Sequence, residues 1–141
     1  MVLMGGSHTT PETLPNIIPE LQNRSVISVV FGYMHFGALT SSGKLLTWGE
    51  YSSGALGLGD PGKLPVGSPG GYVEEEKRVR AQADELRPPG VTVPTEVRFD
   101  HGLTVEGRVK RYCFAAAASG CHTVALVVDL AEDEVPPEGL E

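Results

Sequence analysis

Glycine stands at short intervals in a stretch of this chain that otherwise alternates apolar and polar residues as a β-sheet does. Six glycines occur between His35 and Asp60, and five of them follow the first short apolar run: Gly43, Gly49, Gly54, Gly57 and Gly59. Glycine at this density works against a helix, because each one costs about 1 kcal/mol relative to alanine in a helix interior. The whole chain follows the same trend, with 18 glycines and 11 prolines in 141 residues. We therefore expect a mainly β protein with short strands and many tight turns.

The first strands are predicted near the centre of the N-terminal half. The run "SVISVVFG", residues 25–32, is β-branched and bounded by glycine, which predicts a buried strand. The runs "FGALT" and "KLLTW" then flank Ser41-Ser42-Gly43. This pattern predicts a hairpin in which Gly43 adopts the positive φ that the turn requires.

Further strands are predicted in the second half of the chain. The run "VTVPTEVRF", residues 91–99, is extended, and Pro94 restricts it to a sheet edge or a loop. Residues 109–130 read "VKRYCFAAAASGCHTVALVVDL", which predicts two apolar strands around Ser119-Gly120.

The stretch "GEYSSGALGLGD", residues 49–60, predicts a structured loop held by Ala55, Leu56 and Leu58. Its glycines also suggest a phosphate-binding loop. However, their order is G-x-x-G-x-G, and Asp60-Pro61 follow where a dinucleotide site has a helix or a phosphate loop has Lys-Ser/Thr. We therefore expect a structural loop and no cofactor.

The chain divides into a repeat region, residues 1–130, and an acidic tail, residues 131–141, which we expect to be disordered. An insertion is predicted at residues 61–93, with a helix at residues 74–86 in which glutamate and arginine pair four residues apart. Its apolar stripe is narrow. Two interpretations stay open: a helix that only faces water, and a helix that docks a partner.

Charge and hydropathy limit the partners and the compartment. The formal charge is −7, and the C-terminal stretch carries six acidic residues and no basic one: Asp129, Glu132, Asp133, Glu134, Glu138 and Glu141. Without a cluster of Lys and Arg large enough to neutralise phosphates, we expect neither nucleic acid nor an anionic membrane as a partner. The start of the chain lacks a signal-peptide pattern, and two cysteines form no disulfide framework. We expect an intracellular protein, cytoplasmic or nuclear.

One motif occurs twice. "GYMHFGAL" contains Gly32, His35, Ala38 and Leu39, and "SGCHTVAL" contains His122, Ala125 and Leu126 at the same offsets. In each case an apolar strand with a glycine near its end lies just upstream. Such internal repetition is typical of architectures built from stacked units.

The succession G-x-x-H-x-x-A-L, a glycine hairpin, "LLTWG" and "SSGALGLGD" resembles the repeat of the regulator of chromosome condensation family. The resemblance covers residues 26–60, with Val97 and residues 111–126 as the start of a second repeat. It implies a fragment of a β-propeller: about one full four-stranded blade plus part of another, with one surface helix in an insertion. It also implies that the glycines and the small Ala38 and Ala125 allow neighbouring blades to approach, and that Trp48 is a wedge between blades. The repeat motif then comprises Gly32, His35, Ala38, Leu39, Gly43, Trp48, Gly49, Gly54, Leu56, Gly57, Gly59, His122, Ala125 and Leu126.

A narrower resemblance is to the C-terminal part of fungal F-box propeller proteins of the SCF-associated factor type. It rests on the run from Pro15 to Asp60, the long insertion and the late "SGCHTVALVVDL". It implies a propeller that presents substrates to a ubiquitin ligase. No F-box is visible, because the segment before Leu14 has no amphipathic helices. One blade and part of another cannot close a ring, so we expect a fragment or a shortened form.

No pattern points to catalysis or to a metal. His35 and His122 suit structural hydrogen bonds within the repeats, and together with Cys113 and Cys121 they lack the spacing of a zinc site. We found no nucleophile elbow, zinc-protease motif or paired catalytic carboxylates. We therefore expect no metal and no enzymatic activity.

Since we expect no catalysis and no nucleic acid or membrane partner, the function class that remains is protein binding. Tyr51, Ser52 and Asp60 are the candidate interface, whereas Trp48 is expected in the core, with a binding hot spot as the alternative. We expect a protein-interaction scaffold, of the ubiquitin ligase adaptor type. The alternative is a guanine-nucleotide exchange regulator of a small GTPase.

Overall fold

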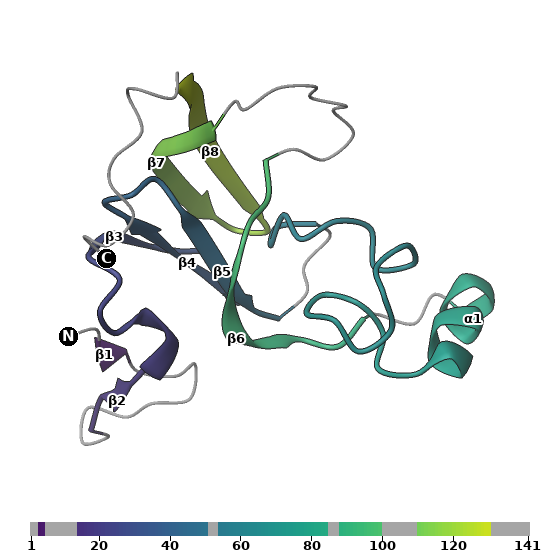
Figure 1. Ribbon diagram of the computed structural model, residues 1–141. Coiled ribbons are helices and arrows are strands. Elements are labelled where there is room, and N and C mark those ends of the chain that lie inside the picture. The colour runs from purple at the N-terminus through teal and green to yellow at the C-terminus, as the bar shows by residue number, and fades with distance from the viewer. Residues whose placement is uncertain (1–2, 5–13, 51–53, 85–87, 100–109, 131–141) are drawn as a thin grey trace.

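The computed structural model describes residues 3–4, 14–50, 54–84, 88–99 and 110–130. A four-stranded antiparallel meander forms the first unit, in the order β3-β4-β5-β6, and a β7-β8 hairpin forms the second (Figure 1). The strands are β3 (Val26–Phe31), β4 (His35–Thr40), β5 (Leu45–Gly49), β6 (Val91–Glu96), β7 (Lys110–Ser119) and β8 (His122–Leu130). The expected mainly β fold, one four-stranded unit plus part of another, is confirmed.

Short elements precede and interrupt the sheets. A two-residue pair, β1 (Leu3–Met4) and β2 (Asn16–Ile17), lies near the N-terminus, followed by the 3-10 helix η1 (Pro19–Leu21). The helix α1 (Glu75–Asp84) lies in the segment between β5 and β6. None of the helices in the described part of the chain is long and apolar enough to cross a bilayer.

The sheet β3–β6 has two faces, which the strand register defines. Leu39 pairs with Leu45 and Gly37 with Thr47, so these residues and His35 share one face, which we call the front face. The opposite, back face carries Phe36, Ala38, Thr40, Leu46 and Trp48. β7 lies against β3 and β4, and an apolar cluster joins the front face to the hairpin through Leu39, Leu45, Val97 and Cys113. The two units therefore stack sheet on sheet.

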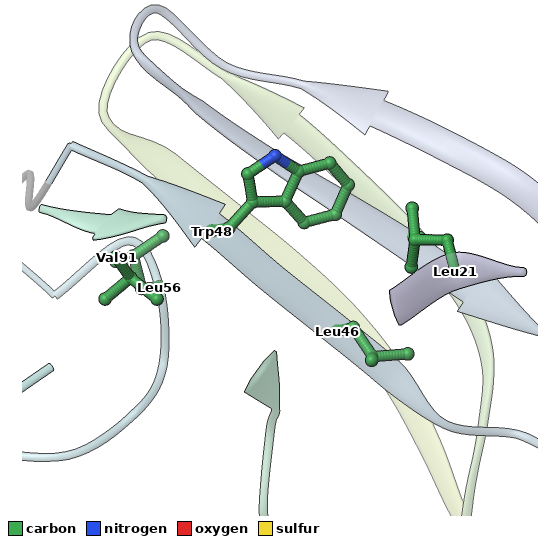
Figure 2. Packing of buried hydrophobic residues seen from close by; sticks show 6 residues of the cluster. Leu21, Leu46, Trp48, Leu56 and Val91 are labelled. Atoms are coloured by element: carbon green, nitrogen blue, oxygen red, sulfur yellow. The ribbon is translucent and has the colours of Figure 1, made fainter. Parts of the chain in front are cut away.

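The back face has its own core. Leu21 from η1 and Leu56 from the loop after β5 cover Leu46 and Trp48, and Val91 completes the cluster (Figure 2). The Trp48 indole stacks on Phe36 with ring centroids 5.7 Å apart, and Trp48 is only 8% exposed. The expected burial of Trp48 is thus found, on the face of the sheet opposite the hairpin. Strand alternation points the indole away from the hairpin, because Leu45 and Thr47 take the other face.

The glycines of the loops mostly adopt a left-handed backbone. Positive φ angles occur at Gly43, Gly49, Gly54, Gly57 and Gly59. Ala55 and Leu56 of the same loop are buried, and the Thr47 hydroxyl donates a 2.6 Å hydrogen bond to the Leu56 carbonyl. The loop after β5 is therefore an ordered part of the first unit.

The insertion is shorter than the sequence indicates and only partly solvated. β6 begins at Val91, so the last three residues of the expected range, 61–93, belong to the sheet, with Pro94 on its edge strand. α1 lies apart from both sheets (Figure 1), and its Val79 side chain is 60% exposed. Its ion pairs join residues three apart: Arg78 with Glu75 at 2.5 Å and Lys77 with Glu74 at 3.8 Å. Tyr72, which precedes the helix, is buried.

Candidate functional site

Within the repeat motif, Gly32 and His35 pack directly against each other. The imidazole of His35 lies directly over Gly32, where a Cβ would approach the ring carbon Cε1 to 1.9 Å. Any other residue at position 32 would displace the ring. His35 itself is fully buried. The spacing G-x-x-H thus has a steric cause: the glycine makes room for the histidine three residues later.

His35 connects the two units. Its Nε2 is 2.8 Å from the Thr123 hydroxyl on β8, a hydrogen bond between side chains of separate sheets. The ring sits on the front face, which is where the hairpin packs. Nδ1 is buried and has no hydrogen-bond partner among the described residues. The role of His35 in this structure is therefore to fix the hairpin against the sheet.

A second contact lies at the β4–β5 turn. Gly43 has φ = 80°, and a Cβ there would approach the Tyr112 ring on β7 to 2.3 Å. The Tyr112 hydroxyl donates to the Ser41 carbonyl at 2.6 Å, and the Cys113 amide donates to the Gly43 carbonyl at 2.9 Å. The tight turn and the close approach both require glycine at this position.

The second copy of the motif is placed differently. Ala125 is half-buried and packs against the apolar cluster between the sheets. His122 is exposed, and Leu126 is 52% exposed. Both lie on the outer face of the hairpin. The hairpin covers their counterparts His35 and Leu39, but no described residue covers this outer face in the same way.

Several turns meet at one end of the two sheets and form a rim. The Tyr33 amide donates to the Gly120 carbonyl at 2.7 Å, and the Glu50 amide donates to the Met34 carbonyl at 2.9 Å. We call Tyr33, Met34, Glu50, Gly120 and Cys121 the rim. Its Tyr33 side chain is 79% exposed. Sequence reasoning missed Tyr33, although a tyrosine in a turn next to the motif is a usable signal.

A cleft opens beside the rim. Its volume is about 330 Å³, and Met34, Phe36, Trp48 and Glu50 contribute to its walls. The walls are mostly apolar, with one carboxylate at Glu50. An exposed aromatic side chain on a turn that is held by backbone hydrogen bonds, next to an apolar cleft, is suited to binding a protein segment.

Of the interface residues expected from the sequence, the structure describes only Asp60. Tyr51 and Ser52 lie outside the described residues, although Glu50, which precedes them, belongs to the rim. Asp60 is exposed, and its Oδ1 accepts a 2.9 Å hydrogen bond from the Gly62 amide. This carboxylate therefore stabilises the turn that follows it.

The described residues contain no group of three or more His, Cys, Asp or Glu side chains that could hold a metal ion. Cys113 is fully buried between the sheets, and burial raises the pKa of its thiol. A protonated, enclosed thiol is a poor nucleophile.

Comparison with known proteins agrees with the fold. A four-stranded antiparallel unit stacked on the first hairpin of a second one is the arrangement of adjacent β-propeller blades. Prp20p from Saccharomyces cerevisiae, a propeller protein of the regulator of chromosome condensation type with binding properties toward Gsp1p and histones, is similar in structure: the TM-score is 0.54 at 18% sequence identity. The match covers 86% of this chain and 20% of Prp20p, so the chain spans about a fifth of that protein's length. No family model matches the chain.

Proposed function

We propose that this chain is part of a protein-interaction scaffold, without enzymatic activity, that binds a protein partner through the rim. The observation that carries the proposal is Tyr33, a large aromatic side chain that is 79% exposed on a turn whose backbone is held by the neighbouring unit. Aromatic residues on rigid turns lose little conformational entropy on binding and dominate many interfaces. The adjacent apolar cleft offers space for a partner side chain.

The class of partner follows from two resemblances. The narrower sequence resemblance favours a substrate-presenting propeller of a ubiquitin ligase, in an intracellular compartment. The second candidate is an exchange regulator of a small GTPase, because Prp20p has binding properties toward Gsp1p. Since this chain spans about a fifth of Prp20p, neither activity passes directly from the whole protein to the chain.

The test compares partners captured by three forms of the full chain: unchanged, Tyr33→Ala and Ile27→Ala. Ile27 is a matched control, because it is 61% exposed but lies at the start of β3, at the other end of the strand from Tyr33. We expect partners identified by mass spectrometry to be lost with Tyr33→Ala and kept with Ile27→Ala. Ubiquitin ligase subunits among the lost partners support the first candidate, and a small GTPase supports the second. A partner set that is the same for all three forms contradicts binding at the rim.

A further inference from the structure

A surface turn in the segment between β5 and β6 carries a hydroxyl group at Ser68. The residues beside it are exposed: Pro65, Val66, Gly67 and Pro69. Ser68 is half-buried, and its Oγ donates a 2.6 Å hydrogen bond to the Pro65 carbonyl. Because β5 and β6 are neighbours in one sheet, both ends of this segment are held by the first unit. The turn therefore belongs to a segment enclosed within that unit.

Hydroxyl groups on the strands are held more firmly. Thr40 and Thr47 are buried in the sheet β3–β6, and Thr123 on β8 is hydrogen-bonded to His35. A protein kinase must bring the acceptor hydroxyl into line with the γ-phosphate of its nucleotide. A residue fixed in a strand reaches that position only when the sheet opens, which costs close to the full free energy of unfolding. These hydroxyl groups are therefore poor phosphate acceptors.

The turn at Ser68 opens at a much lower cost. Backbone hydrogen bonds between residues close in the sequence hold it: the Ser68 amide to the Pro65 carbonyl at 3.1 Å, the Gly71 amide to the Ser68 carbonyl at 3.0 Å, and the Gly67 amide to the Tyr72 carbonyl at 2.8 Å. Segments with local hydrogen bonds and few buried contacts are those that open most readily. An enzyme can therefore reach Ser68 without disturbing either sheet.

The residue after Ser68 selects the kind of enzyme. Pro69 biases Ser68 toward an extended backbone, which suits binding in a cleft. It also has no amide N–H, so a kinase pocket that offers no acceptor at this position favours proline over residues whose N–H would be buried unpaired. Ser68 is the one serine in the sequence that precedes a proline. Thr10, which also precedes a proline, lies outside the described residues.

We propose that Ser68 is a phosphorylation site for a proline-directed serine/threonine kinase and that the phosphate opens the turn. In the transfer, the Ser68 hydroxyl oxygen bonds to the γ-phosphorus of ATP, and the bond from that phosphorus to the ADP oxygen breaks. The hydroxyl proton passes to the aspartate of the kinase's catalytic loop. The products are the phosphoserine and ADP.

Two changes at the turn follow from the transfer. The Oγ has no proton left to donate to the Pro65 carbonyl, and the phosphate adds a charge of about −1.5 to −2. The start of α1, which follows the turn, is acidic, and the basic residues there are already paired: Lys77 with Glu74 and Arg78 with Glu75. Repulsion between like charges and the lost hydrogen bond both favour the open turn.

The test treats the full chain with ATP and either of two purified proline-directed kinases, one cyclin-dependent and one mitogen-activated. We expect phosphate on the tryptic peptide of residues 64–77, in which Ser68 is the only serine or threonine. Ser68→Ala should abolish it. Pro69→Ala should slow the transfer by about tenfold or more, because it restores an N–H that the kinase leaves unpaired. Ser42→Ala is the matched control: Ser42 is also half-buried in a turn with a hydrogen-bonded hydroxyl, but glycine follows it.

Hydrogen exchange measures the second part of the proposal. On phosphorylation the amides of Gly67, Ser68 and Gly71 should exchange about tenfold or more faster, whereas those of β4 should keep their rates. Ser68→Ala removes the hydroxyl without adding charge, so it should speed the same amides by a smaller factor. This comparison separates the lost hydrogen bond from the added charge.

Several results would overturn the proposal. They are no transfer to the unchanged chain beyond that to Ser68→Ala with either kinase, equally fast transfer to Pro69→Ala, or unchanged exchange of residues 67–71 after phosphorylation. Protein isolated from its own cells under phosphatase inhibition should carry the phosphate on the same peptide, and its absence there would also overturn the site. Tyr33→Ala should leave the transfer unchanged, because the rim contains no residue of this turn. This inference and the proposed function can therefore fail separately.

Discussion

The sheet β3–β6 and the hairpin β7–β8 carry the same repeat motif and bury it to different depths. Leu39 is 3% exposed and its counterpart Leu126 is 52% exposed. His35 is fully buried, whereas His122 is exposed. The difference arises from neighbours rather than from the motif. β4 has a strand on each side, the hairpin over its front face and the cluster around Trp48 over its back face, whereas the described part of the chain leaves the outer face of β8 open.

This contrast shows how a repeat unit depends on the next one. A fully buried leucine contributes about 1.5–3 kcal/mol relative to an exposed one, so Leu39 gains a stabilisation that Leu126 lacks in this chain. Units of this kind bury their faces by stacking on their neighbours. The stability of the molecule should therefore reside in the first unit, and the predictions below test this asymmetry.

The largest expected effect is that of Trp48→Ala. The indole is 8% exposed and packs with Leu21, Leu46 and Leu56, so its removal should lower the free energy of unfolding by about 3–5 kcal/mol. Phe114→Ala, on the hairpin, should cost less than about 1 kcal/mol because Phe114 is 49% exposed. Urea unfolding followed by far-ultraviolet circular dichroism measures both.

Trp48→Phe extends this measurement if Trp48→Ala does not fold. It keeps an aromatic ring near Phe36 and should give a smaller loss than the alanine variant. Equal losses for Trp48→Ala and Phe114→Ala would contradict the asymmetry between the two units.

The second effect concerns the motif glycine. Gly32→Ala places a methyl group 1.9 Å from the His35 ring, which must move and lose its contact with Thr123. We expect a loss of about 1–3 kcal/mol, as is usual for overpacking a buried site. Ser119, three residues before His122, is the matched control: Ser119→Ala should change stability by less than about 0.5 kcal/mol, because the site is exposed. Thermal unfolding of both variants measures the two changes in stability. If Gly32→Ala left stability unchanged, the imidazole would not pack against this glycine.

The third effect compares the two cysteines. Cys121 is exposed on the turn of the hairpin, whereas Cys113 is fully buried and its thiol pKa is raised by burial. A thiol reagent should label Cys121 about tenfold or more faster than Cys113, since the thiolate is the reacting form. With Cys121→Ser the remaining reaction reports how often the hairpin leaves the sheet. Gly43→Ala should make this labelling of Cys113 faster, because the added methyl group collides with Tyr112. Similar labelling rates for Cys113 and Cys121 in the unchanged chain would show that the hairpin is not docked against the sheet.

Much of this fold could be predicted from the sequence, because its signals are local. Alternating apolar runs placed all six strands of the two stacked sheets, Gly43 marked the hairpin turn, and the run of charges before Arg87 marked α1. The repeated H-x-x-A-L motif indicated the stacked units, and the likeness to Prp20p agrees with that arrangement. These features depend on residues close together in the chain.

The features that could not be predicted depend on distant contacts. Nothing near Leu21 marks it as a core residue, yet it covers Trp48 from a 3-10 helix far along the chain. The face on which Trp48 lies follows from the β4–β5 register, which a one-residue slip would reverse. The exposure of His122 and the position of Tyr33 on the rim likewise depend on how the two sheets pack together. The sequence motif alone does not specify that packing.

The smallest expected effect is that of the helix in the insertion. Replacing residues 74–87 by a Gly/Ser linker of equal length should change the free energy of unfolding by less than about 0.5 kcal/mol, because Val79 is exposed and ion pairs on a surface helix contribute little. Replacing residues 61–89 should cost more, about 1–3 kcal/mol, since it also removes the buried Tyr72. Denaturant unfolding of both forms against the unchanged chain gives the comparison.

The same two forms separate the two interpretations of the helix. A partner that docks on α1 would be lost from the form that lacks only residues 74–87, although that form stays as stable as the unchanged chain. A helix that only faces water would leave partner capture unchanged in this form. Replacing residues 74–87 could instead lower stability as much as replacing residues 61–89. That result would mean that α1 contributes to the core, and it would contradict the position of α1 apart from both sheets in Figure 1.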